Sequence, residues 1–207
     1  MNEIQAVLFD MDGVLIDARD WHYQALNEAL TIFGFQISYS DHLDRFNGLS
    51  THQKLRVLSE EGIVPNALHT MIAAVKQDRT LRIAAKNCFP NVSHQILVSR
   101  LKNMGIKVGL VTNSIRQTTE FMLEYAGLLK FFDVVITNED VKEGKPNPEG
   151  YFRAMSSLGV TPSQTIIVED GEYGIMAANA TGARVVIVSG PEEVDLELLI
   201  PFVANLK

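Results

Sequence analysis

The stretch Phe9-Asp10-Met11-Asp12-Gly13-Val14-Leu15 decides how this chain is built. It follows a short apolar run from Ile4 to Leu8, which predicts a buried strand. The run ends at Asp10, a second carboxylate stands two positions later, and Gly13 allows the backbone to turn away. Uncompensated charge is unfavourable at the mouth of an apolar strand. A bound cation, a reaction that uses the charge, or simple solvation must therefore account for the pair.

Composition limits the class of protein. The chain has 207 residues with 46% hydrophobic content, enough for one domain or one domain with a small insertion. The net charge of −7 disfavours a nucleic-acid-binding protein, and the single cysteine, Cys88, excludes an internal disulfide and fits a reducing compartment. The first residues carry no basic segment, and no apolar run approaches the ~20 residues of a membrane span. We expect a cytoplasmic protein without membrane or nucleic-acid partners.

Residues 16–87 have the pattern of a helical block without a strand. Apolar residues recur at helical spacing from Arg19 to Phe33, and further helices are expected over His52–Glu61 and Asn66–Asn87. Residues 34–51 are expected to be irregular. The lysines of the block are interpreted as a solvated face: Lys54, Lys76 and Lys86.

From residue 88 onward, apolar strands and helices alternate. The expected strands are Ile106–Val111, Val134–Thr137, Thr165–Val168 and Val185–Val188. The expected helices are Ser93–Met104 with Ser93 as its cap, Arg116–Ala126, Pro148–Leu158, Tyr173–Ala180 and part of Val194–Val203, which Pro201 interrupts. This alternation indicates a parallel sheet with helices on both faces. We predict an α/β fold with a Rossmann-like core domain (residues 1–15 and 88–207) and an inserted α-helical cap domain (residues 16–87).

Polar residues follow three of the predicted strands, at the edge where parallel sheets bind ligands. They are Asp10 and Asp12, Thr112-Asn113-Ser114, and Glu169-Asp170. Four carboxylates at one edge would repel each other, and a divalent cation with oxygen ligands, usually Mg²⁺ beside a phosphate, resolves this. Thr112 and the backbone N–H groups after it can hold phosphate oxygens, and Lys145 can supply a positive charge.

In this order, these motifs resemble those of the haloacid dehalogenase superfamily of phosphotransferases, and the similarity covers nearly the whole chain. The four motifs correspond to Asp10-Met11-Asp12-Gly13-Val14, Thr112-Asn113-Ser114, Lys145-Pro146-Asn147-Pro148, and Glu169-Asp170 with the glycines that follow it. The helical block resembles the small cap of one branch of the superfamily. Within that branch, the chain is similar to the group of β-phosphoglucomutase and the sugar phosphatases.

The resemblance implies a role for each motif. Asp10 would be the nucleophile and Asp12 the general acid and base, so that phosphoryl transfer would pass through an aspartyl phosphate. The implied phosphate ligands are Thr112, Asn113 and Lys145. The implied Mg²⁺ ligands are Asp10, Asp12 through its carbonyl, Asp170, and Glu169 either directly or through another ligand.

We therefore expect a Mg²⁺-dependent phosphatase that acts on a small phosphorylated metabolite, with a sugar phosphate favoured. A phosphomutase is an alternative, but mutases of this group carry a lysine and an arginine in the cap loop, where this chain has Asn47 and Thr51. A non-catalytic module that binds phosphate ligands is a third possibility. The sequence leaves the substrate and the oligomeric state open.

The predicted cap offers His22 and Asn47 as candidate substrate contacts. His22 could equally be a half-buried core histidine. Both side chains are neutral or nearly neutral at pH 7, which predicts a neutral, hydroxylated leaving group. A cap joined to the core by two crossings, near residues 14–18 and 86–90, can hinge and close over the substrate.

Overall fold

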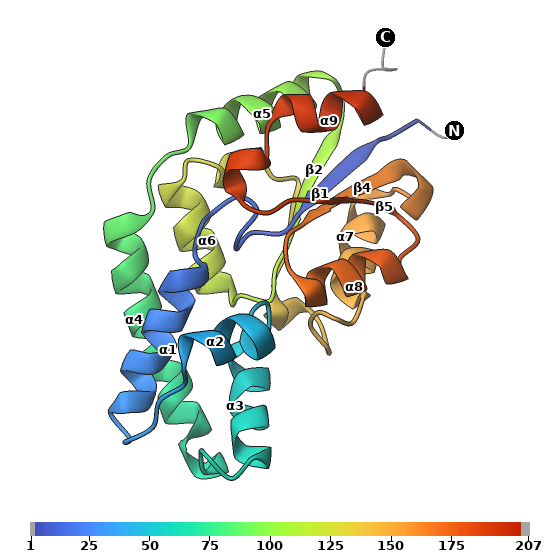
Figure 1. Cartoon of the computed structure of the whole chain (residues 1–207). Helices are drawn as coiled ribbons and strands as arrows, with labels where there is room; N and C mark the ends of the chain where they lie inside the picture. The colour runs from blue at the N-terminus through green and yellow to red at the C-terminus, as the bar shows by residue number, and fades with distance from the viewer. Residues whose placement is uncertain (1–2, 204–207) are drawn as a thin grey trace.

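The structure is a computed structural model that describes residues 3–203, and it contains a parallel five-stranded sheet with helices on both faces (Figure 1). The strands lie in the order β3-β2-β1-β4-β5. Their bounds are β1 Ala6–Phe9, β2 Lys107–Val111, β3 Val134–Ile136, β4 Thr165–Glu169 and β5 Arg184–Ile187. The predicted α/β fold is confirmed.

Strand β1 lies at the centre of the sheet because all four of its residues are apolar and fully buried. Its last residue, Phe9, is in register with Leu110 of β2 on one side and with Val168 of β4 on the other. The polar residues that follow these three strands are therefore brought to the same edge of the sheet, as the sequence predicts.

Alternate residues of β1 face two separate apolar layers. Val7 and Phe9 belong to the cluster formed with α5, α6 and α9, whereas Ala6 and Leu8 belong to the cluster formed with α7 and α8. The helices are α5 Val92–Asn103, α6 Arg116–Tyr125, α7 Glu149–Leu158, α8 Glu172–Ala180 and α9 Leu196–Val203. Four connections between a helix and a strand contain a single 3₁₀ turn: η3 Leu129–Phe131, η4 Asn138–Asp140, η5 Pro162–Gln164 and η6 Pro191–Glu193.

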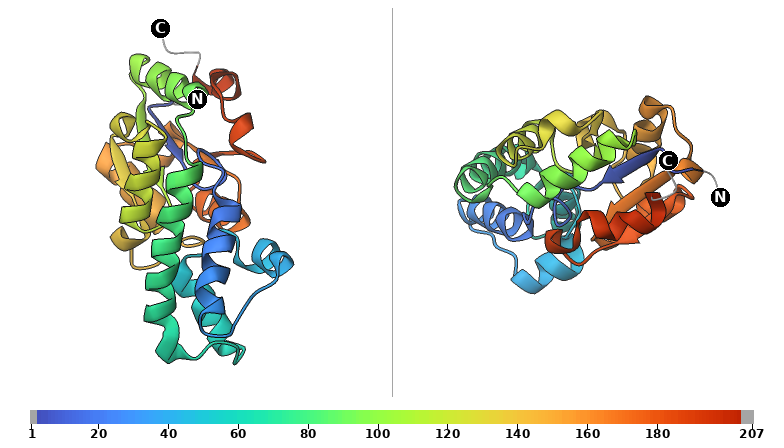
Figure 2. Two further views of the ribbon diagram at one scale, coloured as in Figure 1. Left: turned by 90° about the vertical axis from the view of Figure 1, so that its left-hand side faces the viewer. Right: turned by 90° about the horizontal axis from the view of Figure 1, so that it is seen from above.

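A helical segment extends beyond one end of the sheet (Figure 1). It comprises α1 Arg19–Thr31, α2 Tyr39–Asp41, the π-helical turn η1 His42–Phe46, α3 Thr51–Glu60, the 3₁₀ turn η2 Asn66–Leu68 and α4 His69–Asn87. Helices α1 and α4 run side by side (Figure 2). The segment buries its own apolar cluster around Leu26, Leu55 and Ile72. The division of the chain into a core domain and a cap domain stays a prediction.

Three local predictions are wrong. The segment expected to be irregular contains α2 and η1, because the Ser38 hydroxyl accepts a hydrogen bond from the Asp41 N–H at 3.0 Å and starts a helical turn. Helix α5 is capped by Asn91, whose side chain accepts from the His94 N–H at 3.2 Å, rather than by Ser93. Pro201 lies inside α9, which continues to the buried Val203.

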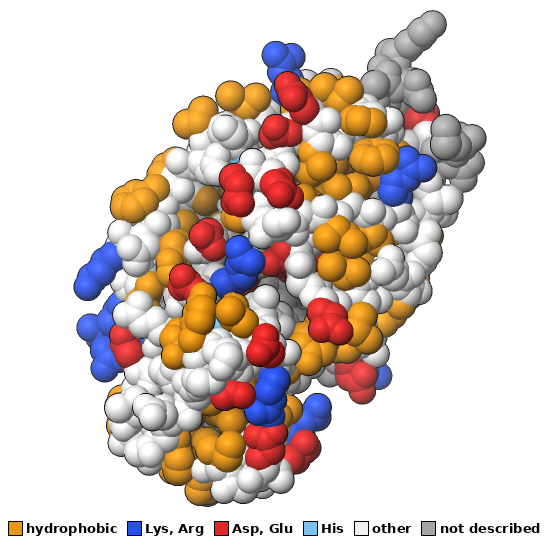
Figure 3. Space-filling view, in the orientation of Figure 1, with side chains coloured by type: hydrophobic (Ala, Val, Ile, Leu, Met, Phe, Trp, Pro, Cys, Tyr) orange, Lys and Arg blue, Asp and Glu red, His pale blue; other side chains and the backbone are white. Residues whose placement is uncertain are grey.

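The surface facing the viewer in Figure 3 carries acidic and basic side chains interspersed with exposed apolar ones. Within residues 3–203, none of the helices has both the length and the apolar character that crossing a bilayer requires.

Candidate active site

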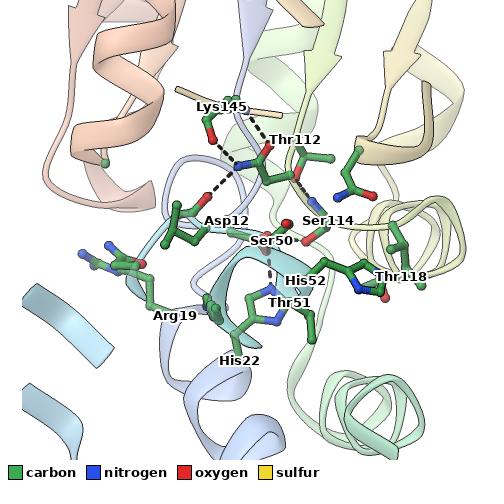
Figure 4. Close-up of a pocket in the computed structure, with 18 of the residues that line it drawn as sticks. Asp12, Arg19, His22, Ser50, Thr51, His52, Thr112, Ser114, Thr118 and Lys145 are labelled. Atoms are coloured by element: carbon green, nitrogen blue, oxygen red, sulfur yellow. Dashed lines mark hydrogen bonds and ion pairs between the residues drawn. The ribbon is translucent and has the colours of Figure 1, made fainter. Parts of the chain in front are cut away.

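A cavity of about 300 Å³ lies between the carboxyl edge of the sheet and the helical segment. All residues predicted for the site line it: Asp10, Asp12, His22, Asn47, Thr112, Asn113, Lys145, Glu169 and Asp170. In Figure 4, His22 and Thr51 approach from the helical segment, whereas Thr112, Ser114 and Lys145 approach from the side of the sheet. The sequence motifs therefore meet in one place.

Lys145 links two buried carboxylates at the base of the cavity. Its ammonium Nζ donates to Asp10 Oδ1 at 2.5 Å and to Glu169 Oε1 at 2.6 Å. The Tyr151 hydroxyl donates to the same oxygen of Glu169. Tyr151, on α7, is absent from the predicted site because its position in the sequence is that of an ordinary core aromatic residue. Together these donors fix the direction in which the Asp10 and Glu169 carboxylates point.

Burial dominates the electrostatics of this group. It raises the pKa of Asp10 well above its usual range; Lys145 opposes that rise, while Glu169 and Asp170 add to it. Burial acts against the charge of Lys145 too, but Asp10 and Glu169 outweigh it and raise the pKa of the ammonium to about 12. Lys145 therefore stays charged at neutral pH and favours the ionised form of Asp10.

Three carboxylates form a cluster suited to a divalent cation. One oxygen from each of Asp10, Glu169 and Asp170 lies within 4.8 Å of the others. Burial and the neighbouring Glu169 raise the pKa of Asp170 to about 6. Two glycines make room for the cluster: a Cβ at Gly13 would lie 2.1 Å from Asp170 Oδ2, and one at Gly174 would lie 2.2 Å from the Glu169 carboxylate. Hard oxygen donors that repel each other fit Mg²⁺.

Asp12 faces the helical segment. Ser114 Oγ donates to Asp12 Oδ2 at 2.8 Å, and His22 Nε2 lies 3.1 Å from the same oxygen. Burial opposes ionisation of Asp12, but His22, Ser114 and Lys76 outweigh it and lower its pKa. The other ring nitrogen of His22, Nδ1, lies 3.1 Å from Lys76 Nζ. His22 thus contacts Asp12 itself, while its predicted role as a substrate contact stays a prediction.

The second motif lines the same cavity and contacts Asp12 through Ser114. Thr112 is buried, and its hydroxyl oxygen accepts from the Ser114 N–H at 3.0 Å, so its own O–H remains available as a donor. The Asn113 side chain holds the loop around Lys145: it accepts from the Lys145 N–H at 2.9 Å and donates to the Lys145 carbonyl at 3.1 Å. It also donates to the Gly48 carbonyl at 2.8 Å, which ties the helical segment to the sheet.

The interpretation of the three lysines as a solvated face is wrong for two of them. Lys54 is only 6% exposed and Lys76 is half-buried, and both line the cavity, whereas Lys86 is exposed. The available sequence signal was the position of Lys54, one residue before Leu55 and four before Leu58, which are both buried on α3. The neutral, hydroxylated leaving group predicted from His22 and Asn47 stays a prediction.

Comparison with known proteins agrees with the motifs. The sequence model of the family described as haloacid dehalogenase-like hydrolase matches residues 7–188. The phosphorylated carbohydrates phosphatase of Thermotoga maritima is 28% identical over 179 residues, 86% of this chain and 82% of that protein. The pyrophosphatase PpaX of Bacillus cereus (strain AH820) is 32% identical over 188 residues, 90% of this chain and 84% of that protein. The fold is similar to that of β-phosphoglucomutase from Clostridium difficile, with a TM-score of 0.84, 22% identity and 98% coverage of both chains.

Proposed function

Because the chain belongs to the haloacid dehalogenase-like hydrolase family and matches named phosphatases, we propose that it hydrolyses a small organic phosphate monoester through an aspartyl phosphate on Asp10. The single observation that carries this proposal is the arrangement of Asp10, Lys145 and Asp12 around one cavity. Binding alone would not require an oriented, buried carboxylate at its base.

Asp10 is suited to attack phosphorus. Its carboxylate lies at the end of β1 and is held by Lys145, so it can approach a phosphate from a fixed direction. Lys145 would also offset negative charge on the phosphoryl oxygens as they pass to Asp10. The buried Thr112 hydroxyl and the backbone N–H groups after it would hold the same oxygens.

Asp12 is suited to move protons. Ser114 and His22 approach one of its oxygens, Oδ2, which leaves the other free to face the ester. The lowered pKa of Asp12 suits it to take a proton from the water that hydrolyses the intermediate. We expect it to protonate the leaving oxygen in the first step with the proton that a monoanionic phosphate ester brings into the site. Because His22 belongs to the helical segment, its contact with Asp12 makes the position of this carboxylate depend on that segment.

Asp10 and Asp170, with the backbone carbonyl of Asp12, would hold Mg²⁺ in the carboxylate cluster that Glu169 completes. When bound, the ion would neutralise charge on the phosphate and on these carboxylates. Glu169 Oε1 is already used by Lys145 and Tyr151, so we propose that Glu169 acts on the ion mainly by positioning Lys145.

The substrate we favour is a phosphorylated sugar or a molecule of similar size. A cavity of about 300 Å³ suits a small metabolite. One relative is named for phosphorylated carbohydrates and another for pyrophosphate. The helical segment would act as a cap that closes over this metabolite, with Asn47 and His22 facing it.

A phosphomutase is the second candidate. Lys54 and Lys76 favour it, since a mutase must hold a second phosphate while the first is transferred. Phosphorus NMR with glucose 1-phosphate separates the two activities. Release of inorganic phosphate supports the phosphatase, whereas formation of glucose 6-phosphate without net release supports the mutase.

The test of hydrolysis is phosphate release from a panel of sugar phosphates, other monophosphates and pyrophosphate. We expect release that stops with EDTA, returns with Mg²⁺ and is absent in Asp10→Asn. Activity close to wild type in Asp10→Asn would show that Asp10 is not the nucleophile. Full activity in metal-free buffer would show that no cation is required.

A further inference from the structure

Lys54 is a buried basic side chain that no anion of the described residues contacts. Its side chain is 6% exposed, and within residues 3–203 it makes no hydrogen bond or ion pair. A buried ammonium without a partner is unfavourable unless a ligand compensates it. Since Lys54 lines the same cavity as Asp10, that ligand can be the molecule whose phosphate reaches Asp10.

A second cation lies beside it. After burial, the charge of Lys76, on α4, is the largest factor that lowers the pKa of Lys54. Lys76 contacts the neutral ring of His22, and Asp12 is the carboxylate that acts on both lysines. Asp12 is held by Ser114, so one side of the cavity has an excess of positive charge.

His42 offers a neutral donor on the same side. It is 1% exposed and lines the cavity, and neither ring nitrogen makes a hydrogen bond of normal geometry among the described residues, although the Arg19 backbone acts on the ring. Burial, with the charge of Lys54, lowers the pKa of His42 to about 4, so its ring carries one N–H and no charge at neutral pH. Its ring packs beside Tyr23 and Tyr39, which fixes its orientation.

The geometry points to a second anion-binding subsite formed by Lys54, Lys76 and His42, which holds a carboxylate or a second phosphate on the leaving group of the substrate. This subsite deepens the proposed phosphatase function and rests on it. The arrangement gives one molecule two anchors: its reacting phosphate at Asp10 and Lys145, and its second anion at the opposite wall. The neutral hydroxylated leaving group predicted from the sequence is replaced by an anionic one.

The experiment compares matched esters with and without the second anion. For a carboxylate, the pair is 2-phosphoglycolate and 2-hydroxyethyl phosphate; for a phosphate, it is glucose 1,6-bisphosphate and glucose 1-phosphate. The quantity measured is the ratio of kcat/KM within each pair, for wild type and for Lys54→Met, Lys54→Arg and Lys86→Met. Near-UV circular dichroism checks that each variant is folded.

We expect wild type to favour the anionic member of at least one pair, and the pair identifies the chemistry of the second anion. Loss of a charge-assisted hydrogen bond should lower that ratio about tenfold or more in Lys54→Met, mainly through KM. Lys54→Arg retains the positive charge and should keep most of the preference. It keeps the proposal testable if Lys54→Met does not fold. Lys86→Met, an exposed lysine of α4, is the matched control and should behave as wild type.

A wild-type ratio near one in both pairs would overturn the subsite, as would equal losses on both members of a pair in Lys54→Met. Either result leaves the phosphatase proposal intact, because hydrolysis is still measured. If wild type with Mg²⁺ releases no phosphate from these four esters or from the panel used to test hydrolysis, the proposed function fails and the subsite fails with it.

Discussion

Replacing Lys54 by methionine should make the folded protein more stable at neutral pH. Burial lowers the pKa of the Lys54 ammonium from 10.5 to about 7; the charge of Lys76 adds to this effect and that of Asp12 opposes it. The neighbouring His22 and His42 are neutral, because burial lowers the pKa of each ring. The folded protein therefore releases the Lys54 proton more readily than the unfolded chain does.

Proton linkage gives the sign and size of this difference in the free energy of unfolding. Between pH 7 and 10.5 the unfolded lysine is protonated while the folded one is largely not, so wild-type stability rises with pH across this window. At about 1.4 kcal/mol per pKa unit, the buried charge destabilises the fold by about 4 kcal/mol at pH 7, as an upper limit, and by little near pH 10.5. Methionine fills a similar volume without the charge and should remove this penalty.

The assay is urea unfolding of wild type, Lys54→Met and Lys86→Met from pH 7 to 10, in buffers free of phosphate and sulfate. Lys54→Met should be the most stable at pH 7, and its advantage should shrink as the pH rises. Added inorganic phosphate should stabilise wild type more than the variant. A Lys54→Met protein that is less stable than wild type at pH 7, or an advantage independent of pH, would refute the reasoning.

Two further predictions concern the catalytic edge of the sheet. Ser114→Ala removes a hydrogen bond that favours the Asp12 carboxylate, so the pKa of Asp12 should rise and the acidic limb of the pH–rate profile should move to higher pH, with about a tenfold loss of kcat/KM; an unchanged acidic limb would show that another group controls it. Mg²⁺ should raise the thermal unfolding midpoint of wild type, and Asp170→Asn should lose most of this rise because it removes one of three clustered carboxylates; an equal rise in both proteins would place the ion elsewhere.

The sheet and its catalytic edge are readable from the sequence because each strand is an apolar run that ends at a polar residue. Strand β1 ends one residue after the expected apolar run, and the residues after β1, β2 and β4 meet as predicted. In contrast, α2 and η1 follow from a single Ser38 side chain that caps a turn, which leaves no periodic signal. Tyr151 is in an ordinary core pattern, and only the fold reveals that its hydroxyl reaches Glu169.

The burial of Lys54 and Lys76 is not readable from the sequence for a related reason. Long basic side chains on helices are usually solvated, and the sequence does not say which face of α3 or α4 covers the sheet. Lys54 and Lys76 become a pair only when these helices fold over the carboxyl edge of β1. The cap loop, with its uncharged Asn47 and Thr51, therefore does not reveal the two lysines that line the cavity.

The most direct test of the central claim is chemical trapping of the intermediate on Asp10. Asp12→Asn should still be phosphorylated by p-nitrophenyl phosphate with Mg²⁺, because p-nitrophenolate leaves without a proton donor, but it should lack the base for the hydrolytic step. Borohydride reduction followed by peptide mass spectrometry should then find the aspartyl phosphate reduced at position 10. A phosphorylated or reduced residue elsewhere, or full turnover with no trapped intermediate in Asp12→Asn, would contradict nucleophilic catalysis by Asp10.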